Sequence, residues 1–198
     1  MNHLAAAGRL RNRYSVMRHG QSKANARGII VSRIETDASG DYGLTGLGRE
    51  QARAAARACP LPAGTLVCSS DFARAWQTAQ IVAACLGSPP VAPAAALRER
   101  SFGSWEGTAV ANYDQVWADD AAGRAGEGVE PAPDVLARAT AYVLDLEREH
   151  AGRDILLVSH GDTAQILLAG FLRRPPATHR SLPPLATAEI RPLVLAPR

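Results

Sequence analysis

Two short segments combine a histidine with groups that bind anions. The segment SVMRHGQSKAN leaves an apolar stretch at Arg18 and His19 and then adds Ser22 and Asn25. The segment ILLVSHGDT leaves a second apolar stretch at His160. A guanidinium binds phosphate oxygens through its forked N–H donors, and an imidazole with one unprotonated nitrogen can attack phosphorus. These residue types predict a site that handles an anion.

A third segment, SSDFAR, supplies another cation. Arg74 falls in the first turn of a predicted helix, where unpaired N–H groups and a partial positive charge favour an anion. Taken alone, an arginine there is usually solvated, and a histidine after a strand is usually a capping or core residue. The coincidence of these residues at three strand ends favours one shared anion site.

Strands and helices alternate around these residues. Predicted strands cover YSVMR, TLVCS and DILLVS, and a last one covers AEIRPLVL, which Pro192 confines to a sheet edge or a bulge. Predicted helices cover LTGLGREQARAAARACP, SDFARAWQTAQIVAACLG, 113–120, 134–150 and HGDTAQILLAGFL. The alternation predicts an α/β fold with three layers, in which helices cover both faces of a mainly parallel sheet. Parallel strands end at one edge, where such sheets bind ligands.

Capping residues and apolar faces set the expected limits of two helices. The first is predicted to have Thr45 as its N-cap and to end before Pro60, with Leu47, Ala54, Ala55 and Ala58 on its apolar face. The second is predicted to run from an N-cap at Ser70 to a stop at Gly87. Its expected apolar stripe is Phe72, Ala75, Trp76, Ala79, Val82, Ala83 and Leu86.

Length and composition favour a folded protein. The chain has 198 residues, of which 46% are hydrophobic and 21% charged, so we expect one domain over 14–198 after a frayed leader at 1–13. The net charge of +3 comes mostly from arginine without a basic stripe. It favours a small anionic substrate over nucleic acid. No window reaches the roughly 18 apolar residues of a membrane span.

Cysteine usage favours a reducing compartment. Cys59, Cys68 and Cys85 are odd in number, lack paired spacing and lie in or beside apolar segments. We therefore expect reduced core residues in a cytoplasmic protein. The sequence gives no indication of oligomeric state.

The segments that follow one another along the chain resemble the histidine phosphatase superfamily, which includes the cofactor-dependent phosphoglycerate mutases. RHGQSKAN is similar to the signature R-H-G-E-S/T-x-x-N. The resemblance continues in family order through LTGLGREQA, SSDFARAWQTA, LRERSFGSWEG and VSHGDT, from Val16 to about Leu172. It implies a phosphoglycerate mutase-like fold and a phosphomonoesterase that needs no cofactor and acts on a small phosphorylated substrate.

The resemblance implies roles for single residues. His19 matches the nucleophile that carries a phosphohistidine. Its other ring nitrogen should donate to a backbone carbonyl, with Gly20 permitting the tight turn. Glu99 matches the proton donor, which needs a raised pKa. The remaining matches are the phosphate ligands Arg18, Arg74 and His160, with Asn25 as a further donor and Ser22 as a binding residue.

Other polar and aromatic residues are expected to support the site. Because the side chains above supply the positive charge that Mg²⁺ gives elsewhere, no metal is expected. We expect structural or packing roles for Glu106, Trp105, Trp76, Asp41, Asp162 and Ser159.

Two departures from the family pattern affect substrate choice. Gln21 stands where the signature commonly has glutamate, which removes a negative charge beside the pocket. The loop at 27–42 is longer than the usual G-x-x-D-x-P connection. It should either be functional or hold structure of its own, with Arg33 as a possible second anion contact.

The activity could be hydrolysis or phosphoryl return. A mutase must exclude water with a closing lid, and the segment between Glu99 and His160 leaves little room for one. A phosphatase is therefore favoured over a phosphoglycerate mutase-type phosphotransferase, and a protein phosphohistidine phosphatase is a third possibility. A non-catalytic phosphate-binding module would be expected to have lost His19 or Glu99, and both are present.

Overall fold

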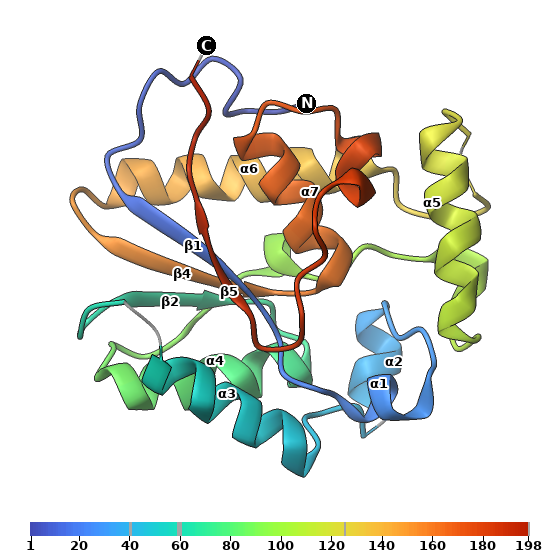
Figure 1. Cartoon of the computed structure of the whole chain (residues 1–198), viewed down its shortest axis with the longest axis horizontal. Helices are drawn as coiled ribbons and strands as arrows, with labels where there is room; N and C mark the ends of the chain where they lie inside the picture. The colour runs from blue at the N-terminus through green and yellow to red at the C-terminus, as the bar shows by residue number, and fades with distance from the viewer. Residues whose placement is uncertain (40, 59–60, 125, 198) are drawn as a thin grey trace.

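A computed structural model of the chain (Figure 1) describes residues 1–39, 41–58, 61–124 and 126–197. A sheet in the order β3-β2-β4-β1-β5 forms its centre. Its strands are β1 (Arg13–Arg18), β2 (Leu66–Ser69), β3 (Ala92–Pro93), β4 (Asp154–Ser159) and β5 (Ile190–Leu193). All neighbouring pairs are parallel except β1 and β5. The predicted α/β fold is therefore confirmed.

Helices cover both faces of this sheet (Figure 1). The face with α3 (Gly46–Ala58) and α4 (Ala73–Leu86) lies opposite the face with α6 (Ala132–Glu149) and α7 (Gly161–Phe171). The helices α1 (Lys23–Arg27), α2 (Ile34–Ser39) and α5 (Tyr113–Ala121) lie beyond the carboxyl ends of the parallel strands. Short 3-10 turns cover Ala95–Leu97, Gly103–Trp105, Val110–Asn112 and Pro176–Ser181.

Alternating side chains of β4 divide the core. Ile155 and Leu157 pack with α6 and α7, whereas Leu156 and Val158 pack with α3 and α4. A strand buried on both faces reads as a continuous apolar run, which is the pattern of DILLVS. β5 lies at the edge of the sheet and contains Pro192, as predicted.

The capping predictions had mixed outcomes. The Oγ1 atom of Thr45 accepts a hydrogen bond from Gly48 N–H at 3.0 Å, and Gly87 ends α4 with a φ of 58°, as predicted. The prediction for Ser70 was wrong, because α4 begins after Phe72, which has no side-chain cap. Ser70 instead bonds His160.

The predicted apolar face of α3 was also wrong. Leu47 is 55% exposed, and the helix buries Gly48, Ala52 and Ala56. The reason is a close approach between backbones, since a Cβ on Gly20 would lie 2.4 Å from the Gly48 carbonyl oxygen. Gly20 is therefore required for this contact, without a positive φ.

Residues 1–13 are packed against the domain, which contradicts the expected frayed leader. Leu4 is fully buried in the core beside α6 and α7. The side chain of Asn2 donates to the Gly170 carbonyl at 2.9 Å, and that of Asn12 donates to Glu147 at 2.7 Å. Apolar side chains packed in this way outweigh the entropy that would fray a terminus.

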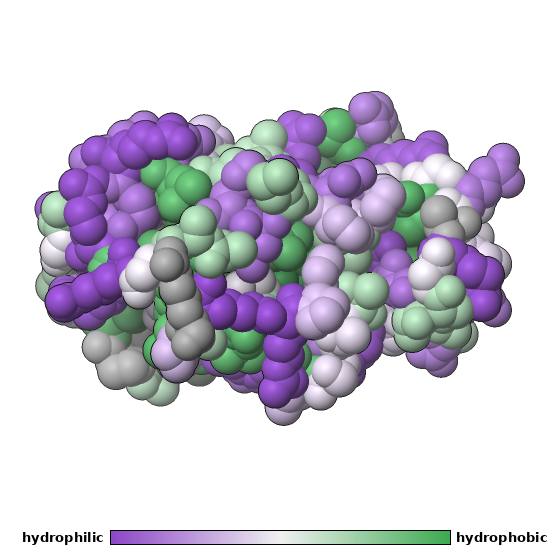
Figure 2. All heavy atoms as spheres, turned by 90° about the horizontal axis from the view of Figure 1, so that it is seen from above, coloured by the Kyte–Doolittle hydropathy of each residue, from purple (hydrophilic) through white to green (hydrophobic). Residues whose placement is uncertain are grey.

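The cysteines and the surface agree in part with expectation. Cys68 is buried as expected, but Cys85 is exposed, which corrects its assignment to the core; Cys59 lies outside the described residues. No described helix is long and apolar enough to cross a bilayer. Figure 2 shows one face, where apolar residues form small groups between hydrophilic ones, as is ordinary for a surface in water.

Candidate active site

The two histidines meet at the carboxyl ends of neighbouring strands. The register of β1 and β4 pairs Arg18 with Ser159, and the N–H of His19 donates to the Ser159 carbonyl at 3.0 Å. The rings of His19 and His160 lie 5.2 Å apart between centroids, at an interplanar angle of 67°. The expected convergence of these two side chains is confirmed.

The hydrogen bonds of His19 fix its tautomer. Its Nδ1 lies 2.7 Å from the Gly20 carbonyl oxygen, which can only accept, so Nδ1 carries the proton. Its Nε2 lies 3.1 Å from the Nε of Arg74, which can only donate. Burial and the charges of Arg74 and Arg18 hold the pKa of His19 well below its usual range. The ring is therefore neutral, with a lone pair on Nε2.

His160 is completely buried behind His19 and does not line the cavity described below. Its Nε2 lies 2.8 Å from the Ser70 hydroxyl, and its ring packs edge-on against Phe72. Burial and the charge of Arg74 lower its pKa strongly. Its buried Nδ1 has no hydrogen-bond partner within the described part of the chain.

Arg74 is held on three sides. Besides Nε on His19, Nη1 lies 3.3 Å from a carboxylate oxygen of Asp37, and Nη2 donates to the Val31 carbonyl at 2.8 Å. Both Arg74 and Asp37 are buried. The backbone N–H of Ala73 also donates to Asp37, at 2.8 Å, so the carboxylate fixes both the helix start and the guanidinium.

Glu99 is a buried carboxyl on the wall of the same site. Its Oε1 accepts from the backbone N–H groups of Arg100 and Thr163, at 3.0 and 3.1 Å. Burial raises its pKa, and the negative charge of Asp162 raises it further. A carboxyl group with a raised pKa keeps its proton nearer to neutral pH, as a proton donor requires.

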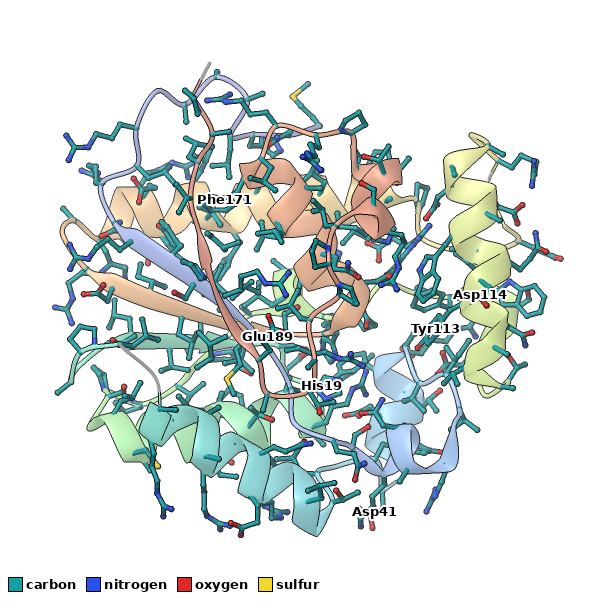
Figure 3. All side chains as sticks on the ribbon, viewed as in Figure 1. His19, Asp41, Tyr113, Asp114, Phe171 and Glu189 are labelled. Atoms are coloured by element: carbon teal, nitrogen blue, oxygen red, sulfur yellow. The ribbon has the colours of Figure 1, made fainter. Side chains whose placement is uncertain are left out.

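A cavity of about 500 Å³ opens between these groups and α5. Figure 3 shows His19 at the end of β1, with Tyr113 and Asp114 on the helix beyond. Both α5 residues line the cavity, and so do Arg18, Ser22, Asn25, Arg74 and Glu99. We refer to this cavity as the phosphate cleft.

Ser22 and Asn25 form a capping box at the start of α1. The Ser22 hydroxyl accepts from the Asn25 N–H, and the Asn25 Oδ1 accepts from the Ser22 N–H at 3.0 Å. The Ser22 Oγ also lies 3.0 Å from Asn25 Oδ1. The Ser22 hydroxyl is thus engaged locally, and Asn25 lines the cleft with its Oδ1 bonded to Ser22.

The long loop at 27–42 holds α2 within its described residues, which leave out position 40. Arg33 is exposed, its guanidinium donates to the Gly103 carbonyl at 3.0 Å, and it does not line the cleft, so its contact with an anion stays a prediction. Gln21 accepts from the Thr45 hydroxyl at 2.8 Å. Ile29 and Val31 of this loop line the cleft, and Asp37 reaches the site through its contact with Arg74.

Most of the residues expected to support the site bond the backbone or other side chains. Glu106 binds the N–H and hydroxyl of Ser32, and the Ser159 hydroxyl donates to the Leu97 carbonyl. Asp41 pairs with Lys23 on the surface. Asp162 bonds Trp117, His179 and Arg100. Trp76 and Trp105 are half-buried.

Sequence reasoning missed Asp37, Tyr113, Trp117 and Arg180 near the site. Tyr113 and Trp117 stand one helical turn apart and stack with centroids 5.3 Å apart. This i,i+4 spacing of aromatic residues was a usable signal. Asp37, on the short helix α2, and Arg180, in the 3-10 turn Pro176–Ser181, had no such spacing pattern.

The model of the histidine phosphatase superfamily (branch 1) matches residues 15–197. The chain belongs to this superfamily. The glucosyl-3-phosphoglycerate phosphatase of Mycolicibacterium vanbaalenii is 34% identical over 177 residues, which cover 82% of this chain and 75% of that protein. The putative phosphoserine phosphatase 2 of Hydrogenobacter thermophilus is 29% identical over 79% of this chain and 76% of its own length.

The fold of this phosphatase agrees with a solved relative. The native structure of mycobacterial glucosyl-3-phosphoglycerate phosphatase superposes with a TM-score of 0.76 at 31% identity, over 93% of this chain and 90% of that one. Transfer of a phosphoryl group through a phosphohistidine is general to the superfamily. The chain is therefore an enzyme of the histidine phosphatase type.

Proposed function

We propose that this phosphatase hydrolyses small phosphomonoesters in the phosphate cleft, with His19 as nucleophile and Glu99 as proton donor. The observation that carries the proposal is the state of His19. Its Nδ1 is fixed by the Gly20 carbonyl, and its Nε2 keeps a lone pair toward the guanidinium of Arg74. A nucleophile and a phosphate-binding cation thus stand 3.1 Å apart.

Phosphate binding would be carried by the positive groups of the cleft. Arg18 and Arg74 supply forked donors for the non-bridging oxygens. Once a phosphoryl oxygen is present, the Nε–H of Arg74 transfers its hydrogen bond from His19 to that oxygen, which frees the nucleophilic lone pair. The charge balance needs no metal ion, and no cluster of metal-ligating side chains occurs among the described residues.

His160 would add a donor from behind the phosphoryl group. The Ser70 hydroxyl accepts from the Phe72 N–H at 3.3 Å, so its own proton can serve the Nε2 of His160. That arrangement places the histidine proton on Nδ1, the buried nitrogen without a partner in the described structure. An unpaired buried donor is stabilised by an acceptor such as a phosphoryl oxygen.

The reaction then proceeds in two displacements. The Nε2 of His19 forms a bond to phosphorus while the ester P–O bond breaks, and the leaving alkoxide takes the proton of Glu99. Water next attacks the phosphohistidine, giving a proton back to the Glu99 carboxylate as the N–P bond breaks. The N–H groups of Arg100 and Thr163 stabilise that carboxylate between the two steps.

Hydrolysis of p-nitrophenyl phosphate in the presence of EDTA tests this proposal. The wild type should turn over and should form an acid-labile, alkali-stable phosphoenzyme from labelled substrate. His19→Gln should form none, and Glu99→Gln should lose about 10²–10⁴-fold in kcat on natural-type alkyl esters, whose poor leaving groups need the proton. Glu106→Gln is the matched control and should keep wild-type kcat, because its carboxylate bonds Ser32 and the Arg33 backbone in the described structure.

Two results would contradict the proposal. One is turnover that persists in His19→Gln, because the phosphoryl group would then have another acceptor. The other is activity in the wild type that disappears with EDTA, because the arginines would then not suffice as electrophiles.

A further inference from the structure

A second cavity, of about 140 Å³, adjoins the phosphate cleft. It shares Arg18, Glu99 and Tyr113 with the cleft and extends to Arg180 and Leu185 of the C-terminal segment. We call it the side chamber. A phosphomonoester bound in the cleft would direct part of its alcohol group toward this space.

Two arginines in the chamber wall have buried N–H groups without acceptors. The Nε atoms of Arg18 and Arg180 are both buried and have no hydrogen-bond partner in the described structure. The Nη1 of Arg18 is held by the Leu185 carbonyl at 2.8 Å. The guanidinium of Arg180 lies 3.7 Å above the ring of Trp117 and donates to the side-chain Oε1 of Gln165. Both guanidinium groups are therefore held in place, and the Nε–H of each has no acceptor among the described residues.

The acidic residues of the chamber compensate these arginines only in part, because Asp162 raises the pKa of Arg180 by less than burial lowers it. Asp162 is already bonded to Trp117, at 2.9 Å, to His179, at 3.2 Å, and to Arg100, at 3.3 Å. Burial raises the pKa of Glu99, which favours its uncharged form. Burial also lowers the pKa of Arg180, as expected for a cation with incomplete compensation. The chamber therefore has donors and positive charge to offer a ligand.

We propose that the side chamber binds a carboxylate on the alcohol group of the substrate, so that Arg180 selects phosphomonoesters of short hydroxy acids. Carboxylate oxygens accept from guanidinium N–H groups with matching planar geometry. The apolar wall at Leu185 and Pro184 suits a short carbon chain beside that group. The inference rests on the proposed function, because the phosphoryl group must occupy the neighbouring cleft.

A pair of substrates that differ only in the carboxylate tests the proposal. The wild type should hydrolyse 3-phosphoglycerate with a kcat/KM at least about tenfold above that for glycerol 3-phosphate, since a buried donor is left unpaired by the second ester. Arg180→Gln should reduce that ratio to about one by raising KM for 3-phosphoglycerate, with glycerol 3-phosphate changed less than about twofold. Arg180→Lys, which keeps the charge without the fork, should give an intermediate ratio.

Arg174→Gln is the matched control, because Arg174 is exposed and lines neither the cleft nor the chamber. It loses the same charge and should keep the wild-type ratio. Equal loss of preference in Arg174→Gln would assign the effect to net charge and overturn the proposal. A wild type that turns over both esters equally, or prefers a bisphosphate over 3-phosphoglycerate, would overturn it as well.

Calorimetric binding in the His19→Gln background separates this inference from the proposed function. Tighter binding of 3-phosphoglycerate than of glycerol 3-phosphate, lost on adding Arg180→Gln, supports the chamber even if no variant turns over. Equal binding of the two esters contradicts it. Absence of p-nitrophenyl phosphate turnover in the wild type would count against the proposed function alone.

Discussion

Two buried arginines on either side of Glu99 show how differently this fold uses the same side chain. Arg100 is 1% exposed and bonds Asp120 twice, at 2.6 and 2.7 Å, and Asp162 at 3.3 Å. Arg74 is 3% exposed and has one carboxylate, at 3.3 Å, with a histidine and a carbonyl as its other acceptors. The two side chains are about equally buried, but Arg100 has two carboxylate partners and Arg74 has one in the described structure.

The pKa shifts of the two side chains follow the same division. Burial lowers the pKa of Arg74 more than its carboxylate neighbours raise it. In Arg100, burial also acts downward, but Asp120 and Asp162 together raise the pKa. A buried cation with matched carboxylates stabilises the fold, whereas one with unmatched charge is available to an anion. The unmatched charge of Arg74 therefore supports the proposal that the phosphoryl group binds on this side of the site.

The strongest test of this contrast is Arg74→Gln. Loss of its guanidinium should reduce kcat/KM for p-nitrophenyl phosphate by about 10³–10⁵-fold, because the group faces both the nucleophile and the transferred oxygens. The melting temperature should fall less than in the Arg100→Gln variant. If Arg74→Gln retains more than about a tenth of wild-type activity, Arg74 is not the electrophile of the cleft.

Arg100→Gln is expected to lose stability and to keep most of its catalytic activity. Removing it leaves Asp120 and Asp162 without their counter-ion in a buried setting, which costs about 3–5 kcal/mol of the free energy of unfolding. Urea unfolding measures this loss, and kcat per folded molecule should stay within about tenfold of wild type. A stable Arg100→Gln variant would show that the acidic pair tolerates burial alone and would remove the structural half of the comparison.

The unmatched charge of Arg74 also predicts how stability depends on pH. The pKa values of His19 and His160 are lowered by burial and by Arg74, so the unfolded chain binds protons below about pH 6.5 while the folded chain does not. Stability is therefore fully present above that pH and falls below it by up to about 1.4 kcal/mol per pH unit for each histidine.

Urea unfolding at several pH values between 5 and 8 measures this slope. The His160→Gln variant should lose the contribution of one histidine, and the slope below pH 6.5 should become correspondingly shallower. A variant with the wild-type slope would mean that the loss of stability in acid comes from the carboxylates.

The sheet edge that holds the site could be predicted because local signals agreed there. Apolar runs, a glycine and helix starts placed His19, Arg74 and His160 at strand ends, and parallel topology brought them together. The prediction of Glu99 depended on the family resemblance, and its raised pKa comes from burial and from the negative charge of Asp162. The contacts that shift this pKa come from tertiary packing and leave no local pattern in the sequence.

The failures have physical causes that can be named. The face of α3 was misjudged because Gly48 is buried by backbone contact with Gly20, which hydrophobicity does not record. Ser70 was read as a cap, but its hydroxyl is shared with His160 across the sheet edge. Asp37 lies on the short helix α2, which was not predicted within the long loop, and its importance depends on where that helix meets Arg74.

Asp37 is the smallest and most specific test of the contrast, because it is the single carboxylate paired with Arg74 in the described structure. Asp37→Asn should lower kcat for p-nitrophenyl phosphate about tenfold, since the guanidinium loses the anchor that directs its Nε toward His19. Asp41→Asn, in the same segment but paired with Lys23 on the surface, is the matched control. Wild-type kcat in Asp37→Asn would show that His19 and the Val31 carbonyl orient Arg74 without it. A loss in kcat together with unchanged inhibition by inorganic phosphate would instead show that Asp37 acts on the orientation of the guanidinium and not on the strength of anion binding.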